Sequence, residues 1–335
     1  MKSEKEKKKR RKIFLSLIMI LFVGVILTAS TYTWFTANQT VTVNELDVNV
    51  STSSGLQVSV DAINWKTIIT RDDITNASRT YTGATNQIPA DATNPVSTAG
   101  EVDSDTGFMK MFLGKLEDPE DTGTLKLTAE QVTEENGATG EFIAFDLFFQ
   151  TNNTMPIQLT QNSSVVAGAT DTSIENAARV AFVPQGNVAA GTDAQTAQAL
   201  HATDSTGLKI WEPNFDVHTA AAVQNAQQTY GITTTQTGGS LLQYYGVKAD
   251  IADGVLANST DGTYFTDMNS TGFIISSPAS GIPSTQYLNV FTLQPGITKI
   301  RVYMWVEGQD VDCENNASGG DLVYNLQFSA LENAG

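Results

Sequence analysis

Cysteine and histidine are scarce in this chain of 335 residues, which has one cysteine and two histidines. A single Cys313 excludes a disulfide within the chain, so packing must hold the fold together. His201 and His218 are 17 residues apart, and the H-E-x-x-H motif of helical zinc proteases is absent. The G-x-S-x-G motif of a serine nucleophile is absent as well. We therefore predict no zinc site, solvated histidines and no enzymatic activity.

Basic residues are also scarce beyond the first 12 positions, which hold 8 of the 19 Lys and Arg residues and 2 of the 36 acidic residues. The rest of the chain has 11 basic and 34 acidic residues, a net charge of −23. Nucleic acids and anionic membrane surfaces repel such a domain, so we predict no nucleic-acid partner. The negative charge is typical of a soluble exported protein, or of a surface that collects divalent cations.

The first 35 residues carry a targeting signal. A basic cluster at residues 7–12 runs directly into the uncharged residues 13–35, and basic residues beside an apolar span stay in the cytoplasm. Residues 13–30 are nearly long enough to cross a bilayer, and Thr28, Ala29 and Ser30 are small enough for a signal peptidase. Residues 1–35 are thus a signal peptide or an uncleaved signal anchor. The remainder is predicted to lie outside the cell or on its surface.

Strand patterns dominate the remaining sequence. The clearest is residues 297–306, which we expect to form a half-buried strand because apolar residues recur there at every second position. About thirteen such segments predict an antiparallel all-β sandwich of jelly-roll or immunoglobulin-like type. We assign it to residues 46–335. Residues 184–240 are rich in Ala, Thr, Gln and Gly and are expected to form a loop-rich insertion.

The alternation changes phase just behind the leader. Apolar residues occupy odd positions first and even positions afterwards: Val41 and Val43, then Leu46, Val48 and Val50. A flat strand cannot keep both sets on one face. One explanation is a β-bulge at Asn44 and Glu45. The other is two strands, in which residues 36–45 form a free donor strand. This strand and the preceding Phe35 would bind a neighbouring subunit, with Phe35, Val41 and Val43 as the assembly residues.

Three stretches suggest a family. The segment 33–38 follows the leader, residues 145–149 precede a polar turn, and residues 324–329 form the last predicted strand. In this layout the chain resembles the camelysin/TasA family of secreted Gram-positive biofilm-fibre proteins. The resemblance implies a jelly-roll subunit that is released from the membrane by a dedicated signal peptidase. It also implies head-to-tail polymerisation of identical copies through the N-terminal strand.

Acidic and aromatic clusters allow a different function. Asp310, Asp312, Glu314 and Asp321 fall in one predicted turn and could bind calcium, or form a solvated acidic turn. Asp103 and Asp105 form a similar, smaller cluster. Five aromatic residues could form a sugar-binding platform or belong to the core: Trp65, Trp211, Tyr244, Tyr245 and Trp305.

The sequence thus predicts an extracellular structural protein, a subunit of a surface or biofilm-matrix fibre that assembles by N-terminal strand addition. The alternative is a membrane-anchored surface adhesin or a carbohydrate- or calcium-binding module. Cys313, which lies between two acidic residues, is either an inert or buried thiol or a link between two subunits.

Overall fold

The computed structural model describes residues 40–50, 56–117, 126–230, 245–247, 255–256, 265–267, 272–276, 288–314 and 317–330. The predicted leader and Phe35 lie outside this part of the chain. Within it, no helix is both long enough and apolar enough to cross a membrane. The described chain is mostly β, as the sequence predicts, and its sheets pack together.

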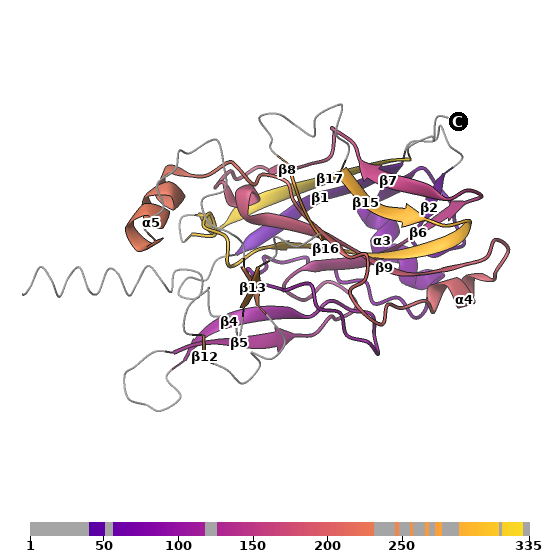
Figure 1. Cartoon of the computed structure of the whole chain (residues 1–335), viewed down its shortest axis with the longest axis horizontal. Coiled ribbons are helices and arrows are strands. Elements are labelled where there is room, and N and C mark those ends of the chain that lie inside the picture. The colour runs from indigo at the N-terminus through magenta and orange to yellow at the C-terminus, as the bar shows by residue number, and fades with distance from the viewer. Residues whose placement is uncertain are drawn as a thin grey trace, which may run out of the picture.

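Two six-stranded sheets form the body of the molecule (Figure 1). The first sheet has the order β15 (Leu288–Leu293), β7 (Met155–Leu159), β17 (Gly320–Ala330), β1 (Val41–Val50) and β3 (Ile68–Thr70), and β8 (Ser164–Ala167) also pairs with β17. The second has the order β14 (Phe273–Ile275), β10 (Lys209–Glu212), β9 (Ala178–Val188), β16 (Gly296–Val306), β6 (Ile143–Thr151) and β2 (Gln57–Ser59). The sheets are mixed rather than purely antiparallel, because β1 pairs in parallel with β17 and β10 with β14.

Two smaller sheets and several short helices complete the described structure. One sheet joins β4 (Met111–Glu117), β5 (Lys126–Val132) and β12 (Val255–Leu256), and the other joins β11 (Tyr245–Val247) and β13 (Phe265–Asp267). The helices are α3 (Arg71–Asn76), η2 (Ala77–Arg79), η3 (Ile174–Ala177), α4 (Ala194–Gln198) and α5 (Ala220–Tyr230). The described part of the predicted insertion, residues 184–230, contains the end of β9 as well as α4, β10 and α5, and is more regular than its composition suggests.

The sequence of the last strand, β17, explains why one face of the first sheet is buried. Buried and half-buried residues alternate along the whole of β17, with Leu322, Tyr324, Leu326 and Phe328 turned inward. This period of two matches the side-chain alternation of a strand. The inward residues meet those of β6, β9 and β16 in one hydrophobic core between the two sheets.

The strand β16 differs from the prediction, because all of its residues are buried rather than every second one. Ile300, Val302 and Met304 enter the core between the sheets, as their spacing predicts. On the opposite face, Tyr303 and Trp305 pack in a second cluster with residues from chain segments 96–111 and 202–210. These distant segments cover the face of β16 that the pattern predicted to be exposed.

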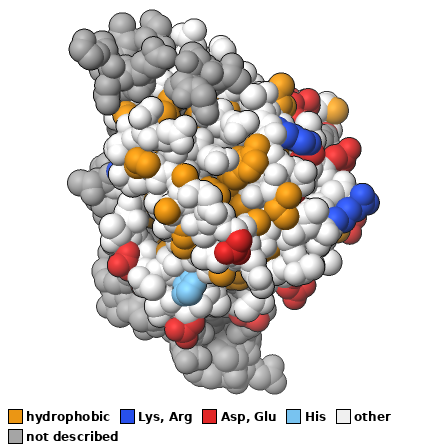
Figure 2. Space-filling model, turned by 90° about the vertical axis from the view of Figure 1, so that its right-hand side faces the viewer, with side chains coloured by type: hydrophobic (Ala, Val, Ile, Leu, Met, Phe, Trp, Pro, Cys, Tyr) orange, Lys and Arg blue, Asp and Glu red, His pale blue; other side chains and the backbone are white. Residues whose placement is uncertain are grey.

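Hydrophobic and charged side chains both lie on the outer surface. Figure 2 shows the end of the molecule at the right of Figure 1, with hydrophobic side chains near the middle of this face and charged side chains mostly at its edge. The large exposed hydrophobic residues of the described chain are few: Ile63, Ile68, Val166 and Ile275.

Four phenylalanine rings lie at the centre of the core, and Phe328 contacts the other three. Its ring centroid is 5.7 Å from Phe149, 5.7 Å from Phe182 and 5.8 Å from Phe291. The contacts to Phe149 and Phe182 are edge-to-face, an arrangement that aromatic quadrupoles favour. These rings join strands of both sheets.

Replacing Phe328 by Ala should lower the free energy of unfolding by about 3–5 kcal/mol, because the change removes a fully buried ring and leaves a cavity. Chemical denaturation of the purified protein measures the loss. The adjacent Ser329 lies on the outer face and is half-buried, so Ser329→Ala is the control, with an expected change within about 0.5 kcal/mol. A loss below about 1 kcal/mol for Phe328→Ala would contradict the role of this cluster.

Candidate functional site

The first strand of the domain is a single strand with a bulge. Val41 pairs with Gly320 and Val43 with Leu322, after which the register shifts and Glu45 pairs with Val323. The pairing skips Asn44. Of the two explanations for the phase change, a bulge or two separate strands, the structure therefore contains the bulge. It turns both phases of the pattern inward, because Val41 is 2% exposed, and Leu46 and Val48 are buried as well.

Residues 36–39 of the predicted donor segment lie outside the described residues, and residues 40–43 are not free within the single chain. Backbone hydrogen bonds hold the start of β1 on both sides, with Val41 donating to the Thr93 carbonyl at 2.9 Å and accepting from the Thr93 N–H at 2.8 Å. The Gly319 N–H donates to the Thr40 carbonyl at 2.7 Å. Arg71 covers the outer edge, because its Nη1 donates to the Val43 carbonyl at 2.6 Å. The predicted assembly residues Val41 and Val43 are thus paired within their own chain.

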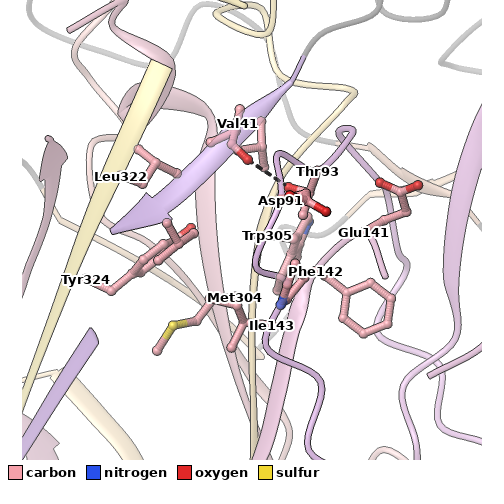
Figure 3. Close-up of a pocket in the computed structure, with 13 residues that line it drawn as sticks. Val41, Asp91, Thr93, Glu141, Phe142, Ile143, Met304, Trp305, Leu322 and Tyr324 are labelled. Carbon is pink, nitrogen blue, oxygen red and sulfur yellow. Dashed lines mark hydrogen bonds between the residues drawn. The ribbon is translucent and has the colours of Figure 1, made fainter. Parts of the chain in front are cut away.

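Val41 borders a narrow slot between the two sheets (Figure 3). Most residues that line the slot are apolar and come from β1, β6, β16 and β17, among them Val41, Ile143, Met304, Leu322 and Tyr324, and three polar or charged residues line it as well: Asp91, Thr93 and Glu141. The remaining cavity measures only about 10 Å³, which is about the space of one water molecule. Little space is therefore left between Val41 and the other residues that line the slot.

The turn that was predicted to bind calcium belongs to a cluster of charged side chains that bind one another. Asp310 forms an ion pair with Arg179, and Glu212 binds the same Arg179 nitrogen at 2.8 Å. Asp312 binds His218 Nδ1 at 2.7 Å and accepts from the Thr219 N–H at 2.8 Å. The prediction that both histidines are solvated is wrong for His218, which is buried.

The other two predicted calcium ligands also have partners in the protein. Glu314 accepts from the Thr219 hydroxyl at 3.3 Å, and Asp321 accepts from the Thr170 N–H at 3.2 Å. Among the described residues, no group of three or more His, Cys, Asp or Glu side chains is arranged to hold a metal ion. Calcium binding stays a prediction, in which the ion would have to replace Arg179 and His218 as the partner of these carboxylates.

Burial tunes the titration of this cluster. It raises the pKa of Glu212 to about 7, although Arg179 opposes the shift, and it raises the pKa of Glu314 to about 7. The thiol of Cys313 is buried, and burial raises its pKa well above the usual value. A thiol of this kind stays protonated and inert at neutral pH.

A second charged cluster lies on the outer face of the second sheet, and the sequence did not reveal it. Arg301 and Asp146 are directly opposite each other on β16 and β6, with Arg301 Nη1 donating to Asp146 Oδ1 at 2.8 Å. Lys299 Nζ lies 3.1 Å from Asp146 Oδ2, and Arg301 also binds Glu134. The one available signal was that Lys299 and Arg301 share the parity of Tyr303 and Trp305 along β16.

The electrostatics of this second cluster are those of a closed ion network. Burial would raise the pKa of Asp146, but Arg301 and Lys299 outweigh it and lower the pKa. Burial lowers the pKa of Lys299, and it raises the pKa of Glu134 against the opposing effect of Arg301. Such shifts mark functional sites and structural ion networks alike.

The three tryptophans of the proposed aromatic platform do not lie in one cluster. Trp211 and Trp305 are buried in the core, and Trp65 is partly buried in a separate small cluster. Tyr244 lies outside the described residues.

Comparison of the chain with protein-family models, with curated proteins and with solved structures gives no match.

Replacing Glu314 by Gln tests the titration of the acidic turn. A carboxyl group whose pKa is raised on folding stabilises the protein fully below its unfolded pKa and loses this contribution as the pH rises through its folded pKa. The wild-type protein should therefore lose stability between about pH 4.5 and pH 8. Glu314→Gln should be more stable than wild type by about 1 kcal/mol at pH 8, a value reduced for the partial exposure of Glu314.

Melting temperatures measured from pH 4.5 to pH 8 check this expectation. Glu45→Gln on the exposed side of β1 is the control and should follow the wild-type curve. Equal stabilities of Glu314→Gln and wild type at pH 8 would show that Glu314 titrates normally.

Proposed function

We propose that this protein is an extracellular structural protein, a subunit of a surface or biofilm-matrix fibre, and that copies join by exchanging the start of β1. One observation carries the proposal. Residues 40–43 come before a bulge, fit a mostly apolar slot between the sheets, and are held mainly by backbone hydrogen bonds. An identical segment of another copy can make every one of these contacts.

The exchange conserves the interactions of the free subunit. The donor residues leave their own slot and enter that of the next copy, where Val41 is again buried and Thr93 and β17 again supply the backbone partners. Swapping an identical element between protomers has a low energetic cost. Asn44, which the β1–β17 pairing skips, is the natural hinge for the movement.

The direction of assembly follows from the two different surfaces involved. A donor strand and an acceptor slot form a heterologous contact, which propagates head-to-tail instead of closing as a symmetric dimer. In this proposal the leader delays assembly, because residues 1–35 hold the donor segment at the membrane until a signal peptidase releases it. The partners are other copies of the chain, and neither nucleic acid nor a catalytic role is proposed.

The fold type belongs to the same proposal. Two packed sheets in which the first and last strands are neighbours suit a jelly-roll or immunoglobulin-like sandwich. The resemblance of residues 33–38, 145–149 and 324–329 to the camelysin/TasA family supports the fibre role. An anchored binding module is the second candidate, and a cavity on the outer face of the second sheet favours it.

A disulfide that locks β1 in its own slot should prevent assembly. Thr42 pairs with Asp321 before the bulge, and neighbouring strands are about 4.8 Å apart, within reach of a disulfide. Protein secreted with both Thr42→Cys and Asp321→Cys, oxidised as a monomer, should form no filaments in negative-stain images. Reduction of the disulfide should restore them, because the start of β1 can then leave its slot.

The matched control uses Asn49→Cys with Gln327→Cys, a pair beyond the bulge that does not exchange. This lock should leave filament formation intact. Oxidation of preformed filaments gives a second measurement, since the first pair should yield a ladder of covalent multimers and the control pair only monomers. Normal filaments from the locked Thr42–Asp321 monomer would overturn the exchange.

A further inference from the structure

A second, larger cavity lies over the charged cluster on the outer face of the second sheet. Its volume is about 190 Å³, compared with about 10 Å³ for the slot beside Val41. Lys299, Arg301 and Asp146 form its floor, and three loops form its walls, within residues 81–85, 105–108 and 198–201. The cavity is distinct from the slot that holds β1.

The floor of this cavity is rigid because its ions are buried and mutually bound. Lys299, Asp146 and Arg301 are 7%, 2% and 1% exposed. Lys299 Nζ donates to the carbonyls of Gln198 and Leu200 at 2.9 Å each, and the Tyr81 hydroxyl donates to the Gln198 carbonyl at 2.9 Å. The floor thereby fixes two of the walls.

The walls are also tied to each other. Gln185 Nε2 donates to the Gly107 carbonyl at 3.0 Å, and Gln185 Oε1 accepts from the Ala202 N–H at 3.2 Å. Gly107 has a φ of +73°, and a Cβ atom there would lie 2.4 Å from Gln185 Oε1. This position therefore requires glycine. A cavity built in this way is open before a ligand arrives, so binding does not have to order the loops.

The lining indicates a neutral ligand. Two cations, Lys299 and Arg301, face two carboxylates, Asp105 and Asp146. The cations are already bound by Asp146, Glu134 and backbone carbonyls, so they offer little to an anion.

The rim has unused hydrogen-bonding groups. The Asp105 carboxylate makes no hydrogen bond to any residue in the described part of the chain, and His201 is exposed with only its Nδ1 near a carbonyl, that of Ala199 at 3.4 Å. Phe108 adds an aromatic ring, with the Arg301 guanidinium 4.4 Å from its centroid. A carboxylate, an imidazole and a ring around a small pocket suit the hydroxyls and apolar face of a sugar.

We propose that this cavity binds one neutral sugar residue, with Asp105 accepting hydrogen bonds from its hydroxyls and His201 completing the contact. The site does not depend on strand exchange, since a fibre subunit and an anchored module could both carry it. It also replaces the tryptophans Trp211 and Trp305 as sugar contacts, because they are buried.

Titration of the full chain with glucose, galactose and mannose, followed by NMR, tests the proposal. The chain is kept in a zwitterionic detergent, because sugar-based detergents would compete. At least one of these sugars should bind saturably, with a Kd on the order of 1 mM for a ligand of this size. Asp105→Ala should weaken binding about tenfold, as expected for a hydrogen bond to a charged group, and His201→Ala should weaken it several-fold.

Two further variants locate the binding. Gly83 lines the cavity, and a Cβ atom there meets only Tyr81 Cε2 at 3.6 Å, so Gly83→Phe should fill the space and abolish binding. Asp72→Ala, at an exposed carboxylate on α3, is the control and should bind as wild type does. Absence of saturable binding by all three sugars would overturn the proposal, as would unchanged binding by Gly83→Phe or a preference for glucuronate over glucose.

Discussion

The parallel pairing of β1 with β17 is the contact on which the first sheet depends. It joins the two ends of the domain, from Val41–Gly320 to Val50–Phe328, and places β1 between β17 and β3. Without it, the inward residues of both strands would lose their place in the core. Such a contact also forms late, because its partners are nearly 280 residues apart and the loop entropy must be overcome first.

This order of events matters for the proposed fibre assembly, in which the chain would be exported from its N-terminal end. The start of β1 would then emerge first and β17 last, so β1 would have no β17 of its own until the whole chain had crossed the membrane. During that interval the slot of another copy would offer the same hydrogen bonds and the same lining. Fibre formation and intramolecular folding would then compete for one strand, and the timing of leader removal would decide between them.

The outer face of the second sheet follows a different principle. Desolvating Arg301, Lys299, Asp146 and Glu134 is costly, and their mutual contacts compensate for it. Buried ion networks of this kind add little net stability, but they restrict which loops can cover the sheet. Here they bind the backbone at Thr85, Gln198 and Leu200 and so keep a polar cavity open above them.

A surface subunit that binds sugars would combine both features. The slot between the sheets lies at the start of β1, whereas the cavity lies on the outer face of the second sheet. Because the two sites share none of their lining residues, exchange of a strand does not have to alter the cavity. A fibre of such subunits would present one sugar site per copy and could bind a polysaccharide multivalently.

The sequence by itself determined the β class, the inward residues of β16, and the phase change at Asn44, because these follow from a local period of two. It did not distinguish a bulge from two strands, since that depended on β17, nearly 280 residues away. Its pattern predicted that one face of residues 297–306, which carries Lys299 and Arg301, would be exposed and that His218 would be solvated, and it left Asp310 and Asp312 either in a calcium site or in a solvated turn. Only the tertiary structure buried these groups and paired them, because distant loops cover the sheet and a buried charge requires a partner.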